Sequence, residues 1–299
     1  MVIILPVQAM AANTDNTNKK CSLAISFFVG DLKAADVEFK IYRVADIASS
    51  DNFSITERFK SYPISQWDFD SSDRWHNLAQ TLSGYVASDN LQADSTAKTT
   101  AEGIAYFNEL PVGLYLVIGS QYITDERIYT PQSFMISAPI KGVNSDLQYD
   151  LAVDVKYNSN ADNENFELHI LKKWNDGSNP NRPQEIIVEL YSNNNLYDTV
   201  LLNKANNWRY TFKDLNKASV WSVKEKSVED GYTVSVERQD NCFVLTNTKA
   251  DTQDNSSDTS DRILPQTGLL WWPVPCLLAG SLLVIIIGIL CRRGTADEK

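Results

Sequence analysis

The sequence predicts an all-β protein with two β-sandwich domains in tandem, a short helical insertion in the first, and a C-terminal transmembrane segment. Three observations lead to this fold class. Apolar and polar residues alternate in many short segments, one stretch has helical periodicity, and a 23-residue apolar run stands close to the C-terminus. With 299 residues, 43% of them hydrophobic, the chain is long enough for two packed domains.

The predicted strands occur in both halves of the chain and are separated by turn residues. Their apolar residues alternate with a period of two, which is typical of antiparallel strands with one buried face. The clearest segments are Leu23-x-Ile25-x-Phe27, Val37-x-Phe39-x-Ile41, Ala105-x-Phe107, Leu114-x-Leu116-x-Ile118, Leu168-x-Ile170 and Val188-x-Leu190. Strands of this kind pack as β-sandwiches.

One segment, residues 73–85, has the helical period instead. Trp75, Leu78, Leu82 and Tyr85 follow one another at intervals of three and four residues and form a single apolar stripe. We therefore expect a helix that is inserted into the first domain and packs against it.

Both ends of the chain have the features of targeting signals. Residues 1–11 are largely apolar and end in Ala9-Met10-Ala11, which predicts the last part of a secretory signal peptide without its basic region. Residues 269–291 form an apolar run that is long enough to span a membrane. Arg292 and Arg293 follow, so the positive-inside rule places the tail 292–299 in the cytoplasm and the domains outside.

The pentapeptide Leu264-Pro265-Gln266-Thr267-Gly268 directly precedes the predicted span. A pentapeptide of this kind, then an apolar span, then a basic tail resembles the sorting signal of Gram-positive surface proteins. The resemblance implies that a sortase cuts between Thr267 and Gly268 and joins the Thr267 carboxyl to an amine. The span then exists only in the precursor. A permanent single-span membrane protein is the alternative.

Two polar stretches divide the chain between these signals. Residues 157–165, rich in Asn and Asp, predict a linker between domains at 20–156 and 166–248. Residues 249–263 have almost no apolar side chains and predict a disordered stalk. Its polar part, residues 249–261, extends about 40 Å at full stretch, which keeps the domains close to the wall unless several copies are joined.

Composition argues against several function classes. The net charge is −11 and no basic cluster occurs outside the extreme C-terminus, which argues against nucleic-acid binding. His76 and His169 are the only histidines and stand far apart, so we expect no metal site, cofactor or histidine-based triad. Cys21 and Cys242 remain in the processed chain, and we interpret both as unpaired structural thiols.

The second half of the chain, Phe166 to Thr248, contains a series of motifs in a characteristic order. They are Lys172-Lys173-Trp174, Arg182-Pro183, Val188-x-Leu190-Tyr191, Asn206-Asn207-Trp208, Phe212-x-x-Leu215, Val223-x-Glu225, Gly231-Tyr232-Thr233-Val234 and Thr246-Asn247-Thr248. This series closely resembles the Cna B-type domain, an Ig-like stalk module of Gram-positive adhesins and pilins. The resemblance implies an internal isopeptide bond between a first-strand Lys and a last-strand Asn, assisted by a Glu.

The strand pattern identifies these three residues independently. Lys172, Asn247 and Glu225 each stand two residues after an apolar residue of an alternating strand, so all three point toward a buried face. Burial lowers the pKa of a lysine and raises that of a carboxyl group. Lys172 is then expected to attack the Asn247 amide, with Glu225 as acid and base. The alternative is that Lys172 reaches solvent and Glu225 is an ordinary strand carboxylate.

The first half contains Gly103-x-Ala105-x-Phe107-x-x-Leu110 and Gly113-x-Tyr115-x-Val117, through which it resembles the N-terminal domain of pilin-type subunits. Phe27 stands where the first-strand Lys would be and Gly119 where the Glu would be, so we expect no such isopeptide bond there.

The same resemblance bears on the end of this first domain. In backbone pilins the corresponding strand ends in a YPK-type motif, whose Lys attacks the sortase-bound Thr of the next subunit. Lys156 has that place, although Asp154 and Val155 replace the Tyr and Pro. Lys156 is therefore a candidate for intersubunit linkage. A solvated lysine at a domain junction is the alternative.

Together these features predict a sortase-processed structural subunit of a Gram-positive pilus or fimbria. The subunit is secreted, anchored covalently to the cell wall or to other subunits, and mediates adhesion. Its expected partners are sortase at residues 264–268, peptidoglycan, other pilin subunits through Lys156, and an unknown host or surface ligand. The alternative is a monomeric wall-anchored adhesin whose N-terminal domain binds that ligand. Apart from the autocatalytic bond, we expect no enzymatic activity.

Overall fold

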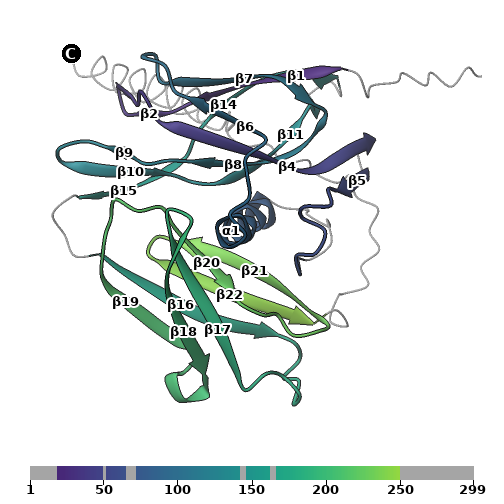
Figure 1. Cartoon of the computed structure of the whole chain (residues 1–299), viewed down its shortest axis with the longest axis vertical. Coiled ribbons are helices and arrows are strands. Elements are labelled where there is room, and N and C mark those ends of the chain that lie inside the picture. The colour runs from purple at the N-terminus through teal and green to yellow at the C-terminus, as the bar shows by residue number, and fades with distance from the viewer. Residues whose placement is uncertain (1–18, 50–51, 65–71, 142–145, 162–165, 250–299) are drawn as a thin grey trace, which may run out of the picture. The chain divides into compact units, whose positions relative to one another are not determined.

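The computed structural model describes residues 19–49, 52–64, 72–141, 146–161 and 166–249 (Figure 1). The predicted signal peptide at 1–11, the stalk beyond residue 249, the sorting motif at 264–268 and the span at 269–291 lie outside the described residues. The part that is described is mostly β-strand, with a single α-helix. The prediction of an all-β chain with one helical insertion is therefore confirmed.

The first half, residues 20–161, contains several sheets. The two that enclose its core have the strand orders β14-β1-β7 and β11-β8-β4-β5, and β6 also pairs with β4. Their strands are β14 (Asp150–Asp154), β1 (Lys20–Ser26), β7 (Ile104–Pro111), β11 (Phe134–Ala138), β8 (Gly113–Gly119), β4 (Glu38–Ser49), β5 (Asn52–Ile55) and β6 (Ser95–Lys98). The smaller sheets consist of β15 (Tyr157–Ala161), β10 (Arg127–Pro131) and β9 (Tyr122–Ile123), of β12 (Ile140–Lys141) and β13 (Leu147–Gln148), and of β2 (Phe28–Val29) and β3 (Leu32–Lys33).

The second half, residues 166–249, contains two sheets with the orders β19-β16-β22-β21 and β18-β17-β20. Their elements are β16 (Phe166–Asn175), β17 (Glu185–Ser192), β18 (Asn195–Asn203), the 3-10 helix η2 (Lys204–Asn206), β19 (Arg209–Leu215), β20 (Trp221–Glu225), β21 (Tyr232–Gln239) and β22 (Cys242–Lys249). Ile170 and Leu245 from one sheet join Val188 and Val223 from the other in a common buried core. The second half is thus a two-layer sandwich.

The two halves share one feature of topology. In the first half β1 pairs in parallel with β14 and antiparallel with β7. In the second half β16 pairs in parallel with β22 and antiparallel with β19. The first and last strands of each sandwich are therefore direct neighbours.

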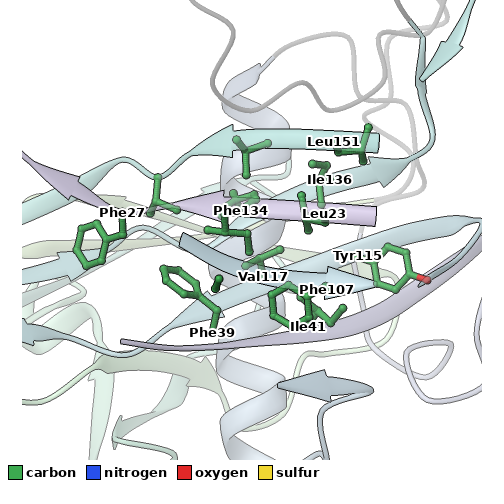
Figure 2. Packing of buried hydrophobic residues seen from close by; sticks show 14 of the residues in the cluster. Leu23, Phe27, Phe39, Ile41, Phe107, Tyr115, Val117, Phe134, Ile136 and Leu151 are labelled. Atoms are coloured by element: carbon green, nitrogen blue, oxygen red, sulfur yellow. The ribbon is translucent and has the colours of Figure 1, made fainter. Parts of the chain in front are cut away.

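The core of the first sandwich lies between its two main sheets (Figure 2). Leu23 from β1, Phe107 from β7 and Leu151 from β14 contribute to the same buried cluster as Ile41 from β4 and Val117 from β8. Leu23, Ile41 and Phe107 come from the alternating segments of the sequence, whereas Val117 lies between Leu116 and Ile118, two apolar residues on the other face of β8.

Helix α1 (Ser72–Ser88) forms where the periodicity predicts it. Trp75, Leu78 and Leu82 pack against the outer face of β8 and β4, in a cluster with Leu114 and Leu116. This packing buries both faces of β8, whereas the alternating pattern predicts one buried face. The expectation of a single buried face is wrong for β8, because the helix covers the side that would otherwise meet solvent.

Part of the predicted linker is a strand instead. Tyr157–Ala161 forms β15 and pairs antiparallel with β10. The Tyr157 ring lies 5.9 Å from the Phe27 ring and 5.6 Å from the Tyr129 ring, measured between centroids. Strand pairing and this aromatic contact outweigh the local Asn-rich composition, which alone indicates a loop. The domain limits at 20–156 and 166–248 stay a prediction, and all described residues belong to one compact unit.

Candidate functional site

Three strands bring Lys172, Asn247 and Glu225 together inside the second sandwich. Lys172 lies on β16 and Asn247 on the parallel neighbour β22, where the register aligns Lys172 with Leu245 and Trp174 with Asn247. The two residues are therefore diagonal neighbours on the inward face of one sheet. Glu225 ends β20 in the facing sheet. The structure thus places an amine, an amide and a carboxyl group between the two layers.

All three side chains are buried. The exposed fraction of the side chain is 0% for Lys172 and 1% for Glu225, and Asn247 has no exposed surface. The Lys172 Nζ atom lies 3.8 Å from Glu225 Oε2, and Asn247 Nδ2 donates a 2.8 Å hydrogen bond to Glu225 Oε1. Lys172 Nζ also donates to the backbone oxygen of Lys173, at 2.9 Å. One carboxyl group thus contacts both potential reactants.

Burial shifts the titration of this pair in opposite directions. It lowers the pKa of the Lys172 amine to about 7, although the charges of Glu225 and Asp176 favour protonation. It raises the pKa of Glu225, although the charge of Lys172 and the hydrogen bond from Asn247 oppose that rise. Burial therefore favours the neutral amine of Lys172 and the protonated carboxyl of Glu225.

Two buried oxygens of the cluster have no hydrogen-bond partner among the described residues. They are Glu225 Oε2 and Asn247 Oδ1. A buried polar atom without a partner costs about 1–3 kcal/mol. A purely structural network would give both oxygens a hydrogen-bond partner. Their lack of partners therefore favours a reactive cluster over a structural one.

Residues 168–248 match the family model of the Cna protein B-type domain. The second sandwich is a Cna B-type domain. The match covers the three site residues, every strand from β17 to β21, and most of β16 and β22. The recognition of this domain from its motifs is confirmed.

Several solved structures resemble the chain at low identity. A single B repeat of the collagen-binding surface protein Cna of Staphylococcus aureus is 18% identical, over 76% of this chain and 96% of that one, with a TM-score of 0.28. The shaft pilin SpaA of Lactobacillus rhamnosus GG is 12% identical, over 78% and 98%, with a TM-score of 0.29. The major pilin SpaD of Corynebacterium diphtheriae is 14% identical, over 78% and 65%, with a TM-score of 0.31. A search of curated proteins finds no match. The family assignment therefore rests on residues 168–248.

The arrangement in the Cna B-type domain is capable of amide exchange. A neutral Lys172 Nζ has a lone pair that can attack Cγ of Asn247. A protonated Glu225 can polarise the Asn247 carbonyl and return a proton to the departing nitrogen. Forming the Nζ–Cγ bond and breaking the Cγ–Nδ2 bond releases one ammonia, so atoms and charge balance without any cofactor.

Two residues beside the Lys172 amine, Trp174 and Asp176, are not among the site residues that the sequence predicts. The Trp174 ring centroid lies 4.1 Å from Lys172 Nζ, and its edge contacts with Trp208 and Tyr232 hold it there. Buried Asp176 accepts from Arg182 and, at 3.0 Å, from the Tyr232 hydroxyl. Trp174, Arg182 and Tyr232 all occur in the family motifs, which was the available signal.

Aromatic packing occupies the corresponding positions of the first sandwich. Phe27 is fully buried, and its ring lies edge-on to Phe39 with 6.2 Å between the centroids. A Cβ atom at Gly119 would lie 2.5 Å from Cε1 of Phe39, so the ring takes the space that a side chain at 119 would need. Neither position carries the amine or the carboxyl group that an isopeptide bond would need.

Lys156, the predicted residue for intersubunit linkage, is separate from this cluster. Lys156 is exposed between β14 and β15, and its backbone oxygen accepts a hydrogen bond from the Gln132 amide. Its amine makes no hydrogen bond or ion pair with any residue that the structure describes. Lys156 is near enough to His76 to help burial lower the His76 pKa. Residues 264–268, the predicted sortase motif, lie outside the described part of the chain.

The described residues also contain other features that bear on the predictions. Cys21 and Cys242 are both free, and burial raises their pKa values, that of Cys21 to about 11. Within the described ranges, no group of His, Cys, Asp and Glu is arranged to hold a metal ion. None of the helices in those ranges is long and apolar enough to cross a membrane; the predicted span at 269–291 is not among them.

Proposed function

We propose that this chain is a structural subunit of a Gram-positive cell surface, a pilus or fimbrial protein that is joined covalently to its neighbours or to peptidoglycan. The observation that carries the proposal is the buried cluster of Lys172, Glu225 and Asn247 in a Cna B-type domain. Its amine lies on the first strand of the domain and its amide on the last. We infer that Lys172 and Asn247 form an isopeptide bond, with Glu225 as proton shuttle. The reaction consumes its own residues and turns over no substrate.

The placement of this bond supports a mechanical role. β16 enters the domain from the N-terminal side and β22 leaves it toward the predicted sorting motif at 264–268. Tension applied along the chain passes from β16 to Lys172, across the new bond to Asn247, and out through β22. The residues between 172 and 247 are then bypassed, so pulling cannot unravel the sandwich. A domain that must resist tension gains directly from this arrangement.

The anchoring steps are also part of the proposal. Sortase would cleave between Thr267 and Gly268 and transfer the Thr267 carboxyl to an amine, which is a peptidoglycan amine at the wall. Within a polymer the amine would be Lys156 of another subunit. Lys156 fits this role because it is exposed and its amine has no partner among the described residues. The mature protein would then be secreted and fixed to the wall, where it meets a host or surface ligand.

An immunoblot of wall material tests this function in the native cells. Walls are digested with muramidase, boiled in SDS and compared between wild type, Lys156→Ala and Lys98→Ala, the last a control that removes another exposed lysine of the first half. A ladder of high-mass bands that disappears only in Lys156→Ala is the expected result. A ladder that persists in all strains would show a polymer linked through another amine. A single band near the monomer mass would instead indicate a wall-anchored adhesin.

A further inference from the structure

The reaction cluster lies beside a seam of the second sandwich. β20, which carries Glu225, is the edge strand of one sheet, and β21 is the edge strand of the other. Helix α1 of the first half contacts both edge strands. An open seam would admit water between the two layers, close to the three reacting side chains. The helix lies where it can close that opening.

Backbone amides on the outer edge of β21 donate to the first half. The Val236 amide donates to Thr81 Oγ1 on α1 at 2.7 Å, and the Val234 amide donates to the Pro63 oxygen at 2.8 Å. Val234 is the antiparallel partner of Asn247 in the neighbouring strand β22. The first half therefore supplies the edge hydrogen bonds of the strand that supports the reacting amide.

The helix also approaches β20 with no space between. A Cβ atom at Gly84 would lie 2.1 Å from the backbone oxygen of Val223, so only glycine permits this contact. Lys224, the residue before Glu225 on β20, donates from Nζ to Ser88 Oγ at 2.8 Å. Burial raises the pKa of Tyr85, and the nearby charge of Glu225 adds to that rise. The helix backbone thus lies against the strand that ends in the catalytic carboxyl.

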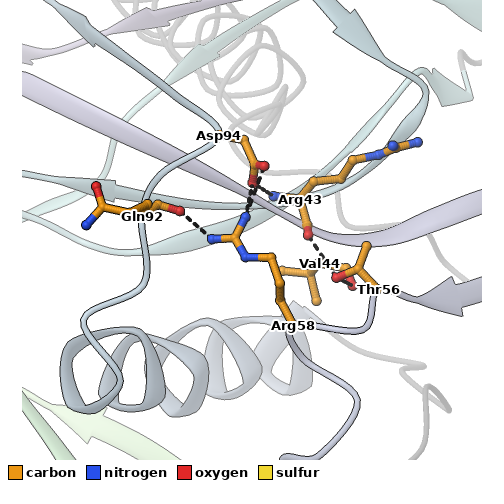
Figure 3. Close-up of polar contacts among 6 residues, drawn as sticks. All are labelled: Arg43, Val44, Thr56, Arg58, Gln92 and Asp94. Atoms are coloured by element: carbon orange, nitrogen blue, oxygen red, sulfur yellow. Dashed lines mark hydrogen bonds and ion pairs between the residues drawn. The ribbon is translucent and has the colours of Figure 1, made fainter.

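The segment that presents Pro63 is itself held in place. Figure 3 shows Arg58 bound to Asp94, with nitrogen to oxygen distances of 3.0 and 3.1 Å, while the Arg43 amide donates to the same carboxylate at 2.7 Å. The Tyr62 ring stacks on Tyr85 with 4.2 Å between centroids. Residues 56–64 and helix α1 therefore form one unit, which we name the edge cover.

We propose that the edge cover belongs to the reaction site of the Cna B-type domain, with Thr81 and Gly84 as positioning residues for the bond between Lys172 and Asn247. The proposal rests on the isopeptide chemistry of the proposed function. The bond between Nζ and Cγ forms, the bond between Cγ and Nδ2 breaks, and Glu225 carries one amine proton to the departing ammonia. Cross-linking then follows the packing of the first half onto the second.

The edge cover promotes the reaction in two ways, by excluding water and by fixing the geometry of the reacting groups. Excluding water favours the neutral amine of Lys172 and the protonated form of Glu225. Fixing β20 and β21 on the same helix holds the carboxyl and the amide at a constant separation. Small displacements of reacting groups slow reactions steeply, since a shift of about 1 Å costs up to about a hundredfold.

The test measures cross-linking in newly made full-length chains. Protein is produced by cell-free synthesis, stopped with acid at intervals, and weighed intact, so that the fraction lighter by one ammonia is followed with time. Gly84→Ala forces the helix away from Val223 while favouring the helix itself. Thr81→Val removes the acceptor for the Val236 amide and keeps the side-chain shape. We expect both variants to react about tenfold more slowly or worse.

A matched control separates this effect from a loss of stability in the first sandwich. A Cβ atom at Gly113 would lie 2.8 Å from Arg43 Nε and 3.0 Å from the backbone oxygen of Ala45, within the first sandwich. Gly113→Ala therefore also introduces strain, although less than Gly84→Ala, and it does so without touching the seam. It should react at the wild-type rate. Equal rates for Gly84→Ala and wild type would overturn the proposal.

The pH profile gives a readout that a merely structural role would not move. The charged groups near the Lys172 amine are Glu225 on β20 and Asp176 and Arg182 beyond the end of β16. Admitting water raises the Lys172 pKa, so the pH of half-maximal rate should move upward in Gly84→Ala and stay unchanged in Gly113→Ala. If the wild type never loses ammonia, the cross-link itself is refuted and this inference with it.

Discussion

Replacing Lys172 by methionine removes the nucleophile while keeping an unbranched side chain of similar length in the core. The variant cannot lose ammonia, so its intact mass equals the calculated mass. Met is apolar and adaptable in buried positions, and burial, which raises the pKa of Glu225, favours the uncharged form of that carboxyl beside it. The main consequence of the substitution is therefore the loss of the proposed covalent link between β16 and β22.

The size of that loss follows from the loop that the bond closes. Lys172 and Asn247 lie 75 positions apart in the sequence. If the chain-entropy relation for disulfides applies to this bond, closing such a loop stabilises the folded state by about 4.5 kcal/mol at 25 °C. All described residues belong to one compact unit. For a cooperative unit that large, 1 kcal/mol shifts Tm by about 2–4 °C, so the variant should melt about 9–18 °C below the wild type.

Intact mass spectrometry and calorimetry on the same preparations check both parts of this reasoning. Lys173→Met is the matched control, because Lys173 is the next residue and points outward from the sandwich. It should keep the ammonia loss and the wild-type Tm. A wild type with its full calculated mass would refute the chemistry. A wild type that has lost ammonia but melts within about 2 °C of Lys172→Met would refute the entropic argument.

Three further predictions concern the same cluster and its counterpart in the first sandwich. Glu225→Gln should retain the full calculated mass, so its Lys172 amine stays free. Burial holds the folded pKa of that amine below the ordinary 10.5. Between the folded and the ordinary pKa, the unfolded state of this variant therefore binds more protons than the folded state. Its unfolding free energy in denaturant titrations should then rise from about pH 7 to about pH 10, by at most about 1.4 kcal/mol per pH unit, whereas Lys172→Met should lack this slope. Asp176→Asn removes a negative charge that favours the protonated amine, so the pH of half-maximal cross-linking in timed mass spectra should fall below that of the wild type. Gly119→Ala would place a Cβ atom 2.5 Å from the Phe39 ring and should destabilise the protein by about 1–3 kcal/mol in calorimetry, without affecting the ammonia loss.

Strand alternation carries much of the information about the reaction cluster. Lys172 and Asn247 break otherwise apolar faces of their strands, and Glu225 does the same in a third strand. A period of two fixes which side of a sheet a residue occupies, so polar residues on buried faces are visible in sequence alone. Their mutual proximity is less visible, since it depends on the parallel pairing of the first and last strands.

Other features could not be read from local patterns. The apolar stripe of α1 predicts its packing on the first sandwich, whereas the opposite face, with Thr81, Gly84 and Ser88, contacts the second. Small and polar side chains on a helix usually indicate solvent, and only the close approach of Val223 explains a glycine at 84. Likewise the polar segment Tyr157–Ala161 becomes a strand because β10 offers it a partner. Long-range contacts decide both cases.

The contrast between the two sandwiches has a mechanical explanation if the subunits are joined as proposed. Tension would enter a subunit at Lys156 and leave it at Thr267. Between these points the chain passes through β15 and into β16, crosses from Lys172 to Asn247, and continues along β22. The two main sheets of the first sandwich end with β14 at residue 154 and lie outside this path, which includes only the short strand β15 beside β10. The first sandwich therefore needs no covalent bond between β1 and β14, and Phe27 can contribute an aromatic ring to its core in place of the lysine that the proposed bond requires.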